Sequence, residues 1–132
     1  MADSTGAMPD ALPARTALAA QLVWAGLSAL WNVSGVLLMA AGKQALGPTA
    51  SIAAAALLVG IAVLLVLCRP RWFWAYAGLS VLAGLMALFA VINAFTADPA
   101  LWPSGFWRYA GAALNAIGVL AAVSAVVVKE TR

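Results

Sequence analysis

Three polar side chains recur on one face of the first apolar stretch, and they are the residues best placed to do chemistry. Gln21, Ser28 and Asn32 follow one another at spacings of seven and four residues, which places them on one face of a helix. In a membrane an unpaired amide is costly, so this face is expected to look toward protein or water. Two interpretations stay open: hydrogen bonding between helices, and a polar lining for a cavity that holds a ligand or a lipid head group.

Two tryptophans lie beside this polar face. Trp24 and Trp31 are again seven residues apart, and both fall too deep in the apolar stretch to mark a membrane interface. The simpler interpretation is bulky packing against a partner helix, and the alternative is an aromatic surface for a cationic or flat ligand. Asn115, in the last apolar stretch, shares a face with Gly111 and Gly118. That pattern predicts a close helix contact with a hydrogen bond across it.

The residue types that carry most membrane chemistry are missing from the apolar stretches. The chain has no histidine, and its four acidic residues lie outside these stretches, at Asp3, Asp10, Asp98 and Glu130. Proton-coupled transport and haem ligation usually depend on such side chains, and Ser–His or Cys–His catalysis requires histidine. A single cysteine, Cys68, excludes an intrachain disulfide and a zinc cluster. We therefore predict a protein that is not an enzyme and that holds no cofactor or metal.

The composition is that of a membrane protein. Hydrophobic residues make up 66% of the chain and charged residues 8%, against about 45–50% and about 25% in an ordinary soluble domain. A soluble fold of 132 residues cannot bury so much apolar surface, whereas a bilayer solvates it. The net charge of +3 comes from cations scattered at the ends of the apolar stretches. Without a basic stripe, no nucleic-acid partner is expected.

Four stretches are long enough to form membrane-spanning helices, which need about 20 apolar residues each. The predicted spans cover about residues 16–41, 49–68, 72–96 and 106–128. Residues 1–14 lack the pattern of a signal peptide and are expected to form a mobile tail. The predicted fold is all-α: a single domain, residues 15–132, that forms an integral membrane four-helix bundle running up-down-up-down.

The cations predict how these spans are oriented. Five fall on one side and two on the other, namely Arg15, Arg69, Arg71, Lys129 and Arg132 against Lys43 and Arg108. Loops with more Lys and Arg remain on the cytoplasmic side of a membrane, so both termini are expected in the cytoplasm. The alanine-rich composition is typical of a bacterial source and hence of a multi-pass protein of the cell inner (plasma) membrane.

Aromatic residues gather where two of the spans should cross the membrane interface. One group is Trp72, Phe73, Trp74 and Tyr76, and the other is Trp102, Phe106, Trp107 and Tyr109. Both are interpreted as interfacial belts. The loop of residues 97–105 is expected to anchor at the interface or, alternatively, to form a docking surface for a partner.

Small residues line faces of several spans and suggest more contact surface than four helices need for each other. They include Ala56 with Gly60, and Ser80 with Gly84. We therefore predict a non-catalytic integral subunit that packs against and stabilises a larger membrane complex. The alternative is a small homodimeric transporter or binding bundle for neutral or lipophilic ligands, built around the polar and tryptophan faces. Expected partners are membrane lipid and either a larger integral membrane protein or a second copy of the chain.

Overall fold

The structure, a computed structural model, describes the backbone of residues 8–127 and the side chains of residues 15–127. In that part of the chain it is all-α, with no strand. The elements in chain order are α1 (Met8–Ala40), α2 (Ile52–Cys68), α3 (Phe73–Thr96), the short 3-10 helix η1 (Pro99–Leu101) and α4 (Gly105–Val127).

Three of the described helices are long and apolar enough to cross a membrane: residues Arg15–Ala40 of α1, together with α3 and α4. The fourth apolar helix, α2, has 17 residues and is about 25 Å long at 1.5 Å per residue. That length is at the lower limit for a spanning helix. The predicted second span began earlier, at residue 49, but Ser51 starts the helix as its N-cap, with its hydroxyl accepting from the Ala54 N–H at 2.9 Å.

Helix α1 begins at Met8, so its first turns occupy part of the segment that was predicted to be a tail up to residue 14. Proline is tolerated at residue 9, because the backbone N–H groups in the first turn of a helix have no acceptor within the helix. Residues 1–7 of the predicted tail lie outside the described residues.

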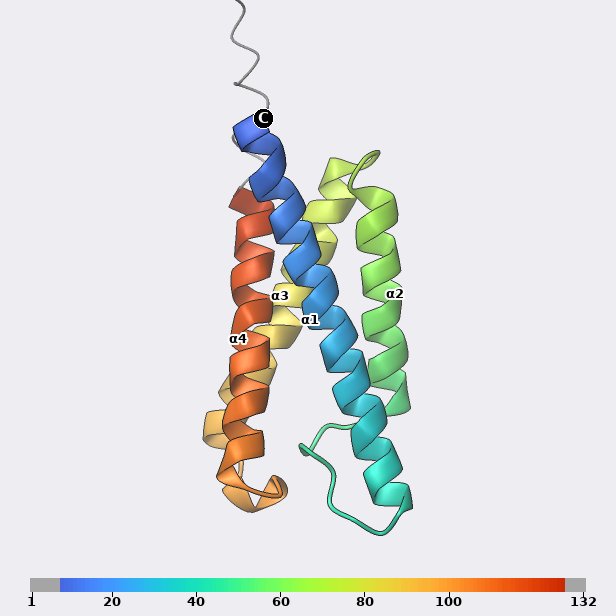
Figure 1. The fold of residues 1–132 in the computed structure, drawn as a ribbon, viewed down its shortest axis with the longest axis vertical. Helices are drawn as coiled ribbons and strands as arrows, with labels where there is room; N and C mark the ends of the chain where they lie inside the picture. The colour runs from blue at the N-terminus through green and yellow to red at the C-terminus, as the bar shows by residue number, and fades with distance from the viewer. Residues whose placement is uncertain (1–7, 128–132) are drawn as a thin grey trace, which may run out of the picture.

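Successive helices run in opposite directions (Figure 1). The start of α1, the α2–α3 turn at Arg69 and the end of α4 lie at one end of the molecule, called here the Arg69 end. The loop of residues 41–51 and the α3–α4 connection lie at the other, the Lys43 end. Helix α1 crosses α3, so that toward the Lys43 end α1 lies beside α2, and α3 beside α4, as two separate pairs (Figure 1).

Glycines set the closest helix contacts. A Cβ atom on Gly84 would lie 2.9 Å from the Cβ of Ala122, which shows how near α3 and α4 approach. The predicted small-residue faces of the third and fourth spans therefore do form helix contacts. On α2, by contrast, Ala56 and Gly60 are exposed, and a Cβ on Gly60 would meet nothing within 4 Å.

The aromatic groups divide between the surface and the interior. Trp72 and Trp74 near the Arg69 end, and Phe106 near the Lys43 end, are exposed, as an interfacial belt requires. Two assignments to the belts were wrong: Tyr76 is 3% exposed and Trp102 is 7% exposed. Tyr76 faces α1 and not lipid, because α1 crosses the helix that carries it. Trp102 turns inward beneath the loop of residues 41–51, because the loop folds over it. Position along a span therefore does not decide which way either ring points.

Candidate functional site

The first residue of the predicted polar face, Gln21, joins α1 to α3. Its amide nitrogen donates to the Ser80 hydroxyl at 2.9 Å, and its amide oxygen accepts from the Tyr76 hydroxyl at 2.9 Å. All three side chains are buried. Gln21 therefore follows the helix-bonding interpretation, since both polar atoms of its amide have partners on a neighbouring helix.

The other two residues of that face lie farther toward the Lys43 end. The Asn32 amide nitrogen donates to the backbone oxygen of Ser28 at 2.8 Å, and its amide oxygen accepts from the Ser51 N–H at 3.1 Å. The second bond connects α1 to the residue that caps α2. Asn32 thus fixes where α2 starts, while both Asn32 and Ser28 also line a cavity.

The two tryptophans of α1 pack against the glycines of α4. A Cβ on Gly118 would lie 2.5 Å from Nε1 of Trp24, and a Cβ on Gly111 would lie 3.3 Å from the ring of Trp31. Trp24 also donates its indole N–H to the Asn115 amide oxygen at 3.2 Å. Both tryptophans thus pack against α4, and both also line the cavity described below, so the two interpretations of these rings stay open. The hydrogen bond of Asn115 lies across this helix contact.

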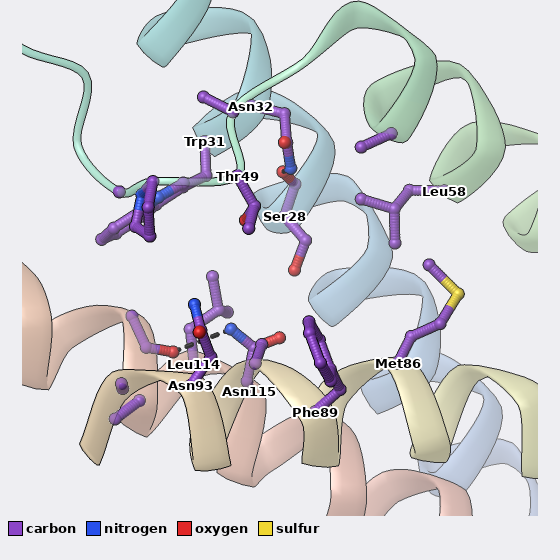
Figure 2. A pocket seen from close by; sticks show the side chains of 18 of the residues that line it. Ser28, Trp31, Asn32, Thr49, Leu58, Met86, Phe89, Asn93, Leu114 and Asn115 are labelled. Carbon is purple, nitrogen blue, oxygen red and sulfur yellow. Dashed lines mark hydrogen bonds between the residues drawn. The ribbon is translucent and has the colours of Figure 1, made fainter. Parts of the chain in front are cut away.

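Between the two helix pairs lies a cavity of about 450 Å³, within the usual range of ligand pockets. It runs from the middle of the helices toward the Lys43 end. Figure 2 shows α1 and the loop of residues 41–51 on one side, and α3 and α4 on the other, with side chains from both sides pointing inward. The labelled side chains are Ser28, Trp31, Asn32, Thr49, Leu58, Met86, Phe89, Asn93, Leu114 and Asn115. Three residues of the predicted polar set, Ser28, Asn32 and Asn115, thus share one cavity, and Gln21 lies apart from it.

The Ser28 hydroxyl is the unsatisfied polar group of this cavity. Ser28 is 6% exposed, and its oxygen has no hydrogen-bond partner among the described residues. The hydroxyl points into the space between α1 and the opposite pair (Figure 2). A buried hydroxyl without a partner costs about 1–3 kcal/mol. Protein atoms cover the Ser28 oxygen almost completely, so a molecule in the cavity that displaces a neighbouring side chain and hydrogen-bonds to this oxygen would recover that cost.

The loop of residues 41–51 forms part of the cavity wall at the Lys43 end, a feature that sequence reasoning missed. Gln44 donates to the backbone oxygen of Ala100 at 2.8 Å, which links this loop to η1. Gly47 lies against both Trp31 and Trp102, since a Cβ there would be 3.6 Å and 3.4 Å from their indole nitrogens. Gly47 and Trp102 were visible only as turn and belt residues, so no pattern in the sequence pointed to this part of the wall.

Arg108 is the one charged residue that lines the cavity among the described residues. It lies one turn into α4, near the Lys43 end. Its Nε donates to the backbone oxygen of Ala94 at 2.6 Å, and its guanidinium lies 5.8 Å and 5.5 Å from the ring centres of Phe95 and Tyr109. Hydroxyl, amide and guanidinium groups in an otherwise apolar lining can bind a ligand.

No family model, curated protein or solved structure matches this chain.

Proposed function

We propose that the protein is a small membrane-embedded binding protein for a lipophilic molecule that carries a hydrogen-bonding group. The observation that carries this proposal is the unpartnered Ser28 hydroxyl in a cavity of about 450 Å³. At about 30 Å³ per molecule the cavity equals roughly fifteen waters. That is far more than one or two structural waters that would satisfy a single hydroxyl. An apolar ligand with one or two polar atoms suits both the volume and the lining.

Replacing Ser28 by alanine should move stability and binding in opposite directions. The empty protein gains roughly 1 kcal/mol, because an unsatisfied buried hydroxyl is removed. Ligand retention falls about tenfold, because the ligand loses a hydrogen bond worth about 1.4 kcal/mol. Native mass spectrometry of the protein from source membranes, in mild detergent, measures the fraction that keeps a bound small-molecule mass, and denaturant titration measures the free energy of unfolding.

Two control pairs make this result specific. Ser34→Ala is the same change on the same helix at a residue that does not line the cavity, and it should alter neither quantity. Ala90→Leu fills the cavity and should abolish retention, whereas Ala113→Leu on the exposed face of α4 should not. Wild-type protein that carries no small-molecule mass would refute a binding function.

A second candidate function is favoured by the exposed small residues of α2. Ala56 and Gly60 form a small-xxx-small pair that no described helix covers, and such pairs allow close helix contact in lipid. They support a packing subunit of a larger membrane complex, or self-association. The same native mass spectra discriminate, because a packing subunit would be recovered with a stoichiometric larger protein or as a dimer of the chain, without a small molecule.

We further propose that the chain crosses the cell inner membrane four times, up-down-up-down, with both termini in the cytoplasm. Support comes from Arg15, Arg69 and Arg71 at the Arg69 end, against Lys43 and Arg108 at the other end. Lys129 and Arg132, which the sequence adds to the first group, lie outside the described residues.

Cysteine labelling tests this orientation. In a Cys68→Ala background, Gln44→Cys should react with a membrane-impermeant maleimide in intact bacterial cells. Arg71→Cys should react only after permeabilisation, because it lies on the cytoplasmic side. Both positions are exposed in the structure. The reverse labelling pattern would invert the orientation, and labelling of both sites in intact cells would rule out the four-span topology.

A further inference from the structure

Most sides of the cavity are closed by contacts between side chains. Between α1 and α4, Trp31 packs on Gly111 and meets Trp107 edge-on, with ring centres 5.7 Å apart. At the side of the cavity that faces the Arg69 end, Trp24 packs against Gly118. No ligand can pass between α1 and α4 without separating these rings.

The aqueous end is partly covered by a loop, in which Pro48 and Thr49 line the cavity and are exposed. The loop of residues 41–51 is held across the Lys43 end by the bond from Gln44 to Ala100, by the bond from Ser51 to Asn32, and by the contact of Gly47 with Trp102. Trp102 is 7% exposed and lines the cavity, so its ring covers part of this end.

The side between α2 and α3 is different. Leu85 and Phe89 of α3 line the cavity, yet they are 59% and 65% exposed. Side chains that both line a cavity and reach the surface lie at its opening. On the α2 side the lining consists of Ala54 and Leu58, so this opening has a wholly apolar rim. Leu85 is midway along α3 and Phe89 is one turn nearer the Lys43 end, which places the opening in that half of the membrane.

We propose that this opening, bounded by Ala54, Leu58, Leu85 and Phe89 and called here the lateral portal, admits a single-chain amphiphile directly from the bilayer. The inference rests on the proposed binding function and adds the ligand class and its route. An acyl chain fits the apolar rim and the depth of the cavity. The polar head is neutral or anionic, because Arg108 lines the cavity and no carboxylate among the described residues does. Both a free fatty acid and a monoacyl phospholipid have this chemistry.

The test uses cis-parinaric acid, a fatty acid whose tetraene accepts energy from excited tryptophan. Full-length protein in phosphatidylcholine nanodiscs should show saturable energy transfer that oleic acid or lysophosphatidylcholine displaces. The one of these two competitors that displaces the probe more strongly identifies the natural source of the acyl chain. Leu85→Ala/Phe89→Ala widens the portal, and because both side chains also line the cavity, the affinity should fall as well. The readout of the route is the stopped-flow association rate, which should rise about tenfold.

The matched control is Leu88→Ala/Ile92→Ala, which removes exposed apolar side chains of α3 that do not line the cavity. Its rates should equal those of the wild type. Gln44→Ala, which releases the loop at the aqueous end, should also leave the rates unchanged. Rates that respond to Gln44→Ala and not to the portal variant would overturn the lateral route. Absence of saturable transfer would overturn the single-chain ligand, while a small-molecule mass retained by the same protein would leave the binding function standing.

Discussion

Gly118→Val is expected to destabilise the protein by about 3 kcal/mol. A Cβ atom at this position would lie 2.5–2.7 Å from three atoms of the Trp24 indole, and Trp24 is 2% exposed. Trp24 also lines the cavity, so its ring can shift only by leaving its packed position, and overpacking of this kind costs about 1–3 kcal/mol, occasionally more. Displacing the indole also breaks its hydrogen bond to Asn115, worth roughly 0.6–1.7 kcal/mol in a membrane helix pair.

The measurement is the free energy of unfolding in mixed micelles, followed by tryptophan fluorescence. Gly26→Ala and Gly60→Ala serve as controls, because a Cβ at either position meets nothing within 4 Å. These two substitutions should be neutral or should stabilise by up to about 1 kcal/mol, since alanine favours the helix over glycine. In a double-mutant cycle, Trp24→Leu should reduce the cost of Gly118→Val. Additive effects would show that the α1–α4 contact does not depend on this pair.

The positions of the helices could be read from the sequence, because they depend on local properties. Long apolar stretches bounded by Arg69-Pro70-Arg71 and by the proline-rich segment around Pro99 predicted α3 and α4 to within one residue at each end, whereas α1 begins eight residues before its predicted start. The second helix was predicted too long, because nothing in an apolar stretch shows that Ser51 will cap it. The membrane character followed from composition, and three helices meet the requirements of length and hydropathy.

The candidate site was only partly predictable. Helical spacing correctly placed Gln21, Ser28 and Asn32 on one face of α1, but spacing cannot show what that face meets. Helix α1 crosses α3 (Figure 1), and Gln21 bonds to α3. Ser28 and Asn32, farther along α1, line the cavity between the helix pairs. The crossing angle is a tertiary property, so the division of one polar face into a bonding part and a cavity part could not be read from the chain.

The same crossing leads to the second large expected effect, at Gln21. Gln21→Leu keeps most of the side-chain volume and removes both hydrogen bonds to α3. Interhelical hydrogen bonds in membranes contribute roughly 0.6–1.7 kcal/mol each, so the expected loss is about 2 kcal/mol. The Ser80 hydroxyl, which is 0% exposed, is left without its donor, and that keeps the loss above the sum of the two lower limits.

A double-mutant cycle with Ser80→Ala separates the bond from the packing. If the amide–hydroxyl bond carries the effect, Gln21→Leu/Ser80→Ala should be more stable than the sum of the single variants by about 1 kcal/mol. Gln44→Leu is the matched control: its amide also bonds a neighbouring segment, but it is exposed, and its loss should be less than about 0.5 kcal/mol. Equal effects at Gln21 and Gln44 would mean that burial adds nothing to the Gln21 bonds. The contact of α1 with α3 would then be held by apolar packing alone.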